Sequence, residues 1–431
     1  MTVKKISGLL HLWLGLASGI IVFIVSITGC IYVFEKEIKN IIEPWRFISS
    51  QKGPFLEPSK LSSIAENVVK GKKAGSLTYN GANEAVVISF FSRNKVKEAK
   101  AGDRYEVVYL NPYNGAVLKV KSLSRGSNSD FFRFVLNGHR ALWLPYPIGR
   151  PIVGVSVLVF VIMLLSGIVL WWPRKWIRSI RDKSFKIKWN GSFKRANYDT
   201  HNVLGFYSCL FLLIISLTGL VWSFQWFSKS VYWLSSGGKS IPEYKQPISD
   251  TTLTVPFKMT AIDKIWMSLS GNGNNRTAMF ISIPKKSADA IGISVYYNQG
   301  TYYKMDYHYF DQHSLKVLKA DGPYFGKYAD AGAADKLRRM NYDIHVGAIL
   351  GLPGKILAFL ASLISASLPV TGFLIWWGKR KKSKKRKYTG RLKPDEIDLN
   401  ERILLKPILK RREFAINKAE NLLLGSCEIN K

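Results

Sequence analysis

Residues 6–34 read ISGLLHLWLGLASGIIVFIVSITGCIYVF, an apolar run without a single charged residue. A helix needs about 20 apolar residues to cross a bilayer, and in lipid a helix satisfies its own backbone polar groups. The run is too long for the apolar part of a secretory signal peptide and lacks a clear small-residue cleavage site. We therefore expect an N-terminal helix that stays in the membrane.

Three further stretches have the same apolar character. They cover about 148–172, 203–227 and 346–377, and Pro353 and Pro369 interrupt the last one. The sequence thus predicts a membrane α-helical protein, a four-helix transmembrane bundle with soluble segments between its helices. The expected parts are transmembrane helices at 1–34, 139–173, 201–227 and 345–377, soluble domains at 35–138 and 228–344, a basic loop at 174–200, and a basic tail at 378–431.

The distribution of Lys and Arg predicts the orientation. Both the short loop between the second and third spans and the segment after the fourth span are rich in these residues. Short loops with an excess of Lys and Arg stay in the cytoplasm, whereas long domains are exported largely regardless of charge. We expect both termini in the cytoplasm and the two soluble domains outside it.

The charge and cysteine content narrow the class of protein. The net charge of +34 is typical of nucleic-acid binding, but beside four spans it is better explained by contact with anionic lipid. We therefore expect membrane lipid as a partner and no nucleic acid. The three cysteines are Cys30, Cys209 and Cys427, and none lies in a soluble domain, so no disulfide framework is expected. No CxxCH motif occurs, which argues against covalently attached haem.

The spans show a two-fold internal repeat. His11 is followed by Gly15, Thr28 and Gly29, and His201 is followed at the same intervals by the same residue types. His139 precedes Gly167 and a Trp-Trp pair, and His345 precedes Gly372 and a second Trp-Trp pair at nearly the same intervals. The repeated unit is a helix, an outer domain and a second helix.

The soluble segments also correspond to each other, and each predicts a small α+β domain. A candidate helix (58–69; 260–268) is followed by strand-like runs (85–91; 279–283 and 291–297). A hairpin closes each segment: strands at 105–110 and 116–120 flank a turn at 111–115, and strands at 307–310 and 315–318 flank a turn at 311–314.

The four histidines at the span ends are the candidate functional residues. The topology places His11 and His201 near the cytoplasmic face and His139 and His345 near the outer face. Facing pairs His11/His201 and His139/His345 would each supply the two neutral imidazoles that a non-covalently bound haem b takes as axial iron ligands. Two such haems, at levels roughly 25–30 Å apart, would form an electron path across the membrane. No catalytic residue is assigned.

Small and basic residues near each level extend the candidate sites. Gly29 and Gly219 fall near the outer pair, and Gly167 and Gly372 near the inner pair, where glycine would let a porphyrin approach the backbone; helix packing explains glycines in spans equally well. The candidate contacts for haem propionates are Arg140, Arg150 and Lys355 outside, and Arg174 and Arg195 inside; headgroup anchoring is the alternative.

Other interpretations of the histidines explain the pattern less well. A single histidine at a span end is usually an interfacial polar residue, but four at matched positions are harder to explain in that way. Zinc is a poorer match, because each pair has no nearby Cys, Asp or Glu to complete a zinc site. His308 and His313 have no counterparts in the first hairpin, and we interpret them as surface residues.

Several motifs resemble the PepSY-associated transmembrane family. They are HLWLGL at 11–16, NGHRALW at 137–143, LWWPR at 170–174, DIHVG at 343–347, GLPG at 351–354 and IWW at 375–377. The resemblance covers the chain to about residue 387. It implies PepSY-like outer domains and a bacterial inner membrane, and some members are similar to reductases that pass electrons through two b haems to ferric siderophores in the periplasm.

From this resemblance we expect a transmembrane haem-dependent ferric reductase that serves iron uptake. The acceptor would be a periplasmic ferric siderophore or chelate. No GxGxxG motif precedes a βαβ pattern, so the electrons would come from a reduced flavin, a reductase or a quinol on the cytoplasmic side. Two alternatives stay open: a non-enzymatic scaffold whose PepSY-like domains bind a periplasmic partner, and a component of iron-chelate transport.

Overall fold

Four helices of the computed structural model are long and apolar enough to cross a membrane. The structure describes residues 2–90, 104–124, 130–173, 175–253, 256–271, 278–297 and 300–389. The four helices are α1 (Val3–Tyr32), α5 (Tyr146–Trp171), α7 (Phe193–Ser223) and α11 (Gly351–Thr389). The chain divides after Gly372, and the part before this division contains the sheet and all four histidines of interest.

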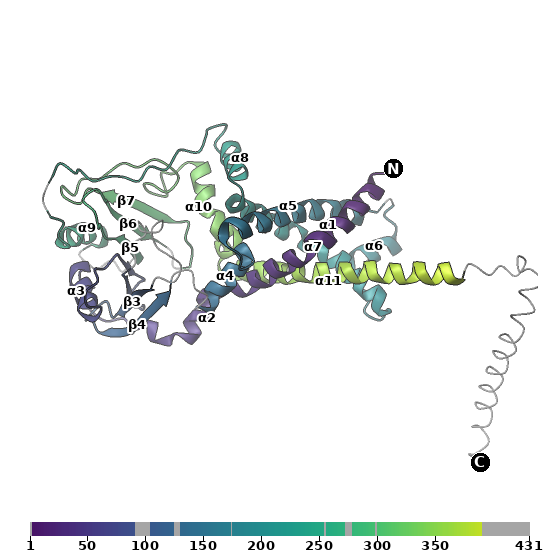
Figure 1. The fold of residues 1–431 in the computed structure, drawn as a ribbon, viewed down its shortest axis with the longest axis horizontal. Coiled ribbons are helices and arrows are strands. Elements are labelled where there is room, and N and C mark those ends of the chain that lie inside the picture. Colours follow the sequence, from purple (N-terminus) through teal and green to yellow (C-terminus); the bar gives the residue numbers. More distant parts are fainter. Residues whose placement is uncertain are drawn as a thin grey trace, which may run out of the picture. The chain divides into compact units, whose positions relative to one another are not determined.

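The four helices share one apolar core. Figure 1 shows α1, α5 and α7 alongside one another, and α11 joins them through contacts such as Ser26 Oγ to Ser365 Oγ at 2.9 Å. The core of this bundle consists of Val22, Phe160, Leu164, Cys209, Leu212 and Ala361. Large apolar side chains on the outside, such as Ile20 and Leu210, remain exposed, as they must if lipid surrounds the bundle. The chain is thus a multi-pass membrane protein.

The ends of the helices differ from the prediction. Residues 139–173 are two elements, because α4 (Phe131–Ala141) stops before Pro145 and α5 begins after it. Likewise, α10 (Ala333–His345) ends before the turn at Gly347 that leads through the short helix η3 (Ala348–Leu350) to α11. His139 and His345 therefore lie on helices that lead into the spans, not on the spans themselves.

Glycines make both of these corners possible. A Cβ on Gly149 would overlap the carbonyl oxygen of Ala141, and a Cβ on Gly354 would overlap that of Gly347. Each spanning helix can therefore fold back closely against the end of the preceding helix. This close packing places His139 and His345 near the first residues of α5 and α11.

The third span begins earlier than expected. The basic loop contains α6 (Arg178–Phe185), and α7 starts at Phe193, inside the predicted loop. Buried Asp199 anchors this first turn, since its Oδ2 accepts hydrogen bonds from Arg195 Nε at 2.8 Å and from the Lys188 amide at 3.2 Å. Phe224 ends the helix, and α8 (Gln225–Ser235) follows directly.

The two soluble segments form one sheet instead of the two separate α+β domains predicted from the sequence. The antiparallel strands have the order β4-β3-β2-β1-β5-β6-β7 (Figure 1). Their bounds are β1 (Ser76–Tyr79), β2 (Val86–Ser89), β3 (Arg104–Leu110), β4 (Val117–Ser124), β5 (Ala278–Ser282), β6 (Ile291–Tyr296) and β7 (Met305–Phe310).

The joint between the segments is the ladder of β1 with β5. Leu77 pairs with Ile281 and Tyr79 with Met279, and all four side chains are fully buried in one common core. Helices α3 (Pro58–Val68) and α9 (Thr260–Ser270) contribute Leu61 and Ile262 to this core. Each segment alone would expose the edge of β1 or β5, and pairing satisfies their backbone groups and buries the apolar side chains together.

The hairpin turns correspond as predicted, but the second hairpin is shorter. Asn111 Oδ1 accepts the amide of Tyr113, and Asp311 Oδ1 accepts the amide of His313, both at 2.9 Å. After the second turn the chain makes only an isolated bridge, Phe310 with Val317, where a strand was expected at 315–318. The remaining elements of the first segment are α2 (Glu35–Ile42) and the short helix η1 (Pro44–Arg46).

Candidate functional site

The four histidines form two pairs, as predicted from the topology. The ring centroids of His139 and His345 are 6.1 Å apart, with an interplanar angle of 66°. The ring centroids of His11 and His201 are 6.3 Å apart, with an angle of 88°. We call His139/His345 the sheet-side pair, because α4 and α10 lead from the sheet segments, and His11/His201 the loop-side pair.

The length of α1 sets the spacing between the pairs. His11 and Gly29 lie on this one uninterrupted helix, and Gly29 contacts His139. At a rise of about 1.5 Å per residue, the two levels are about 27 Å apart. The two pairs therefore lie near opposite ends of the spans.

Each histidine of the sheet-side pair is held by a neighbouring spanning helix through Nδ1. His139 Nδ1 lies 2.9 Å from the carbonyl oxygen of Val25 and 3.4 Å from Thr28 Oγ1, both on α1. His345 Nδ1 lies 3.0 Å from the carbonyl oxygen of Ile215 and 3.0 Å from Thr218 Oγ1, both on α7. A carbonyl oxygen only accepts hydrogen bonds, so Nδ1 carries the proton.

The loop-side pair is held in the same manner. His11 Nδ1 lies 3.0 Å from Ser166 Oγ on α5, and His201 Nδ1 lies 2.8 Å from Thr371 Oγ1 on α11. Both hydroxyls donate their own protons to backbone carbonyls one turn earlier, Ser166 to Met163 and Thr371 to Ser367. Their oxygens are thus acceptors toward the imidazoles, which again places the proton on Nδ1.

A glycine follows each of these hydroxyl residues and contacts the same imidazole ring. A Cβ on Gly29 would lie 3.2 Å from His139 Cε1, and the corresponding distances are 3.3 Å for Gly219 to His345, 3.4 Å for Gly167 to His11 and 3.3 Å for Gly372 to His201. The sequence placed these glycines at the correct levels. In the structure these glycines make room for the histidine rings, and their contact with a porphyrin stays a prediction.

Burial disfavours the charged form of both sheet-side imidazoles. Burial is the main cause that lowers the pKa of His345, and the neighbouring His139 lowers it further, to about 3. Burial also lowers the pKa of His139. The neutral imidazole is the form that ligates a metal.

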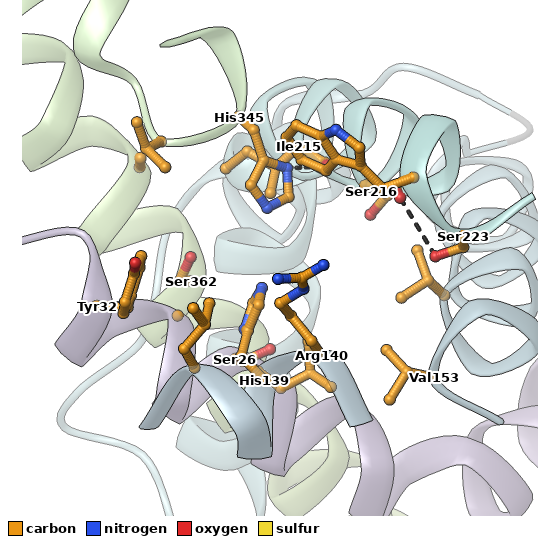
Figure 2. A pocket seen from close by; sticks show the side chains of 18 of the residues that line it. Ser26, Tyr32, His139, Arg140, Val153, Ile215, Ser216, Ser223, His345 and Ser362 are labelled. Atoms are coloured by element: carbon orange, nitrogen blue, oxygen red, sulfur yellow. Dashed lines mark hydrogen bonds between the residues drawn. The ribbon is translucent and has the colours of Figure 1, made fainter. Parts of the chain in front are cut away.

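A pocket of about 500 Å³ adjoins the sheet-side pair. His139 and His345 point into it, and Arg140 lies beside His139 (Figure 2). All four spanning helices contribute small side chains to its wall: Ser26, Ser156, Ser216, Ser223, Ser362 and Ser365. The volume lies within the range of small-molecule and cofactor sites.

Two of the three predicted outer basic contacts line this pocket. Arg140 donates from Nη2 to the Tyr146 hydroxyl at 2.9 Å, and Arg150 lies over the same ring with its guanidinium carbon 5.8 Å from the centroid. Lys355 does not line the pocket. Its Nζ lies 2.7 Å from Glu37 Oε1 in an ion pair between α11 and α2, and its contact with a propionate stays a prediction.

The inner basic residues have a different outcome. Arg195 is occupied by its ion pair with Asp199, while Arg174 lies outside the described residues. Sequence reasoning also missed Arg338, which lines the sheet-side pocket from α10. The helical spacing could have revealed it, because Arg338 and His345 are seven residues, or about two turns, apart and therefore share a helix face.

The spacing of each pair fits two imidazoles that would hold one metal ion between them. With iron–nitrogen bonds of about 2 Å and roughly 1 Å from each ligating nitrogen to its ring centre, such rings lie about 6 Å apart. Within the described ranges no hydrogen bond involves the Nε2 atom of any of the four histidines, so each Nε2 is available to a ligand. Those ranges also contain no group of three or more His, Cys, Asp or Glu arranged to hold a metal ion. Each pair supplies two ligands, which is the number that a porphyrin-bound iron needs from the protein.

The comparison with known protein families agrees with the arrangement of spans. A family model described as "PepSY-associated TM region" matches residues 9–379, a stretch that includes all four histidines. No curated protein matches the chain.

Proposed function

We propose that this chain, which belongs to the PepSY-associated transmembrane family, is a di-haem b oxidoreductase. It would carry electrons across a bacterial inner membrane. The cytoplasmic donor would be a reduced flavin, a reductase or a quinol. The acceptor would be a ferric siderophore or another ferric chelate in the periplasm. The protein would act in iron uptake.

One observation carries the proposal: two histidine pairs have the same spacing, the same protonated nitrogen and the same support. The ring centroids are 6.1 and 6.3 Å apart, and every Nδ1 faces a hydroxyl oxygen on a neighbouring helix. A hydrogen bond at Nδ1 fixes the ring orientation and leaves Nε2 unprotonated for the metal. Isolated interfacial histidines would have no reason to share these features.

The bound haem would supply reversible one-electron chemistry at iron. His139 and His345 would hold one haem at one end of the bundle, and His11 and His201 would hold the other at the opposite end. The hydroxyls of Thr218 and Thr371 orient the rings of His345 and His201. Two pairs at levels about 27 Å apart would divide the crossing into shorter transfers.

We also propose the orientation and the internal repeat. The basic loop and the basic C-terminal segment favour the cytoplasm for the loop-side pair and the periplasm for the sheet. The repeat is supported by the matching contacts: His139 meets Thr28 and Gly29, and His345 meets Thr218 and Gly219. Both halves would descend from one unit of two helices and a soluble segment.

The first experiment is an absorption spectrum of the detergent-purified protein before and after reduction by dithionite. We expect a low-spin bis-histidine b-haem spectrum and two haems per chain. His345→Ala and His201→Ala should each lower the content to about one haem per chain and affect opposite ends of the bundle. A colourless protein from cells that make haem normally would refute the proposal and favour the scaffold interpretation.

The direction of electron flow needs a second assay. In sealed inverted and right-side-out vesicles, a membrane-impermeant ferric chelate should be reduced only when it is on the sheet side. His345→Ala should abolish this reduction, whereas Lys355→Gln should retain it, because Lys355 lies outside the pocket. Equal reduction from both sides would contradict the proposed path.

A further inference from the structure

Arg339 lines the sheet-side pocket and donates to backbone carbonyl oxygens, and three further arginines also line this pocket. They are Arg140 on α4, Arg150 on α5 and Arg338 on α10, together called the arginine cluster. Within the described part of the chain, none of the three makes an ion pair with Asp or Glu. Three positive charges around one cavity repel one another unless an anion lies between them.

Two of these arginines have buried donors without an acceptor. The Nε atoms of Arg150 and Arg338 are both buried and form no hydrogen bond. A buried charged donor that lacks its partner is costly, so chains seldom retain one without a function. Serine and tyrosine partners occupy only part of the cluster: Arg338 Nη1 donates to Ser228 Oγ at 2.6 Å and Arg140 to Tyr146.

Tyr146 brings two members of the cluster together. The guanidinium carbons of Arg140 and Arg150 lie 5.1 and 5.8 Å from the centroid of its ring. Cation–π contact partly offsets the cost of bringing two like charges near one ring. This arrangement holds both guanidinium groups at the pocket and leaves donors for a bidentate acceptor.

The neighbouring Arg339 shows what a satisfied arginine looks like in this region. Its three guanidinium nitrogens donate to the carbonyl oxygens of Pro323, Met305 and Phe325. Arg339 is therefore a structural residue that ties α10 to the loops around β7. Asp335, three residues before Arg338 on the same helix, accepts from the Tyr232 hydroxyl at 2.9 Å and forms no ion pair with Arg338.

We infer that Arg140, Arg150 and Arg338 form a carboxylate-binding site at the sheet-side pocket. The inference rests on the proposed function, which offers two sources of carboxylate: the propionates of the bound haem, and a carboxylate-bearing ferric chelate. Arginine suits either one, because its planar fork matches the two oxygens of a carboxylate. We choose Arg338 as the residue to substitute, because it lies on the same helix as His345.

The first arm tests the cofactor's carboxylates without iron. Haem-free protein is titrated with metal-free protoporphyrin IX and with its dimethyl ester, and binding is followed by quenching of tryptophan fluorescence. The wild type should prefer the free acid, and Arg338→Gln should reduce that preference about tenfold. Arg133→Gln is the matched control, because Arg133 is exposed on α4 and lies outside the pocket.

The second arm tests the acceptor's carboxylates. The haem-loaded protein reduces ferric citrate or a hydroxamate chelate that has no carboxylate. If the site binds the acceptor, Arg338→Gln should raise KM for ferric citrate about tenfold relative to KM for the hydroxamate chelate, when both are measured on the same haem-loaded preparation. Citrate should then also bind the haem-free wild type more tightly than the variant.

The outcomes separate the two ideas. An effect in either arm supports the site and identifies its ligand. If Arg338→Gln and Arg150→Gln both behave like the Arg133→Gln control in both arms, the inference is overturned. The porphyrin and citrate titrations need no iron at the histidines. A wild type that binds the free acid selectively but never acquires haem would therefore refute the proposed function while leaving the carboxylate site in place.

Discussion

The imidazole of His345 lies directly against the backbone of Gly219, since a Cβ at Gly219 would be only 3.3 Å from His345 Cε1. Thr218, the residue before it, receives the Nδ1 proton of the same ring at 3.0 Å. A hydroxyl residue followed by glycine therefore binds a histidine from another helix: the hydroxyl accepts the Nδ1 proton, and the glycine leaves room for the ring. The same dipeptide binds the other three histidines, at 28–29, 166–167 and 371–372.

Gly219→Val should displace the His345 ring, because the larger side chain needs the space that the imidazole occupies. We expect haem content to fall from two to about one per chain, with the loss confined to the sheet-side pair. Gly205→Ala is the control, since a Cβ there would make an ordinary contact at 3.6 Å with Leu368. Pigment analysis of both purified variants checks the prediction, which fails if Gly219→Val retains both haems.

Thr371→Val should weaken the loop-side pair, because it removes the 2.8 Å partner of His201 Nδ1. Loss of such a supporting hydrogen bond typically lowers metal affinity about 10–100-fold. Thr28→Val should have a smaller effect, since Thr28 Oγ1 is 3.4 Å from His139 Nδ1 and the Val25 carbonyl oxygen is closer at 2.9 Å. Rates of haem loss to a haem-scavenging protein measure the difference, and equal rates in the two variants would contradict it.

Cysteines at Thr78 and Phe280 should form a disulfide when membranes are oxidised. These residues are register partners across β1 and β5, and the Cα atoms of antiparallel partners are about 4.5–5.5 Å apart, within disulfide reach. The control pair is Thr78 with Ser294, which lies one strand further on, at about 10 Å. Peptide mass analysis should find the first cross-link and not the second; its absence would argue against a shared sheet.

Asp311 should make the second hairpin sensitive to acid. Burial, the largest single influence, would raise its pKa, but hydrogen bonds from the Ser314, Asp250 and His313 amides and the Ser314 hydroxyl together outweigh it and lower the pKa to about 2. The stabilisation is therefore complete above the unfolded value near 4 and is lost as pH falls through about 2. Asp311→Asn should cost on the order of 1–2 kcal/mol at pH 7 and little at pH 2.

Hydrogen exchange of residues 311–316 in the full-length protein measures this difference. Protection in the variant should fall at pH 7 and converge with the wild type as the pH approaches 2, once rates are corrected for intrinsic exchange. Asn111→Ala in the first hairpin serves as the uncharged comparison, because its side chain makes the equivalent contact to Tyr113. A loss of protection that is independent of pH would exclude the carboxylate charge as the cause.

The parts of the structure that the sequence predicted are those written in local patterns. Uninterrupted apolar runs mark the spans, and equal intervals from His11 and His201 to Thr-Gly predicted which ends of the bundle carry histidines. The pairing His139/His345 followed from orientation alone, since four antiparallel helices bring alternate ends together.

The parts that the sequence missed depend on contacts between distant segments. Strand β1 is only four residues long and follows a glycine-rich stretch, and its second partner, β5, belongs to the other half of the chain. No local pattern predicts that ladder. The contact of each glycine with a histidine ring was not predicted, because sequence intervals give the level of a residue in the bundle but not the ring that packs against it. The ion pair of Lys355 with Glu37 is likewise a tertiary contact.

The ladder between β1 and β5 has a consequence for how the protein is made. Ribosomes deliver β1 long before β5, and the second and third spans must enter the membrane between the two. Until then β1 has an open edge, a state that invites aggregation and calls for a chaperone in the compartment that receives it. Once it has formed, the sheet also keeps both soluble segments on the same side of the membrane. Neither helix pair can then invert unless the buried core of the sheet unfolds.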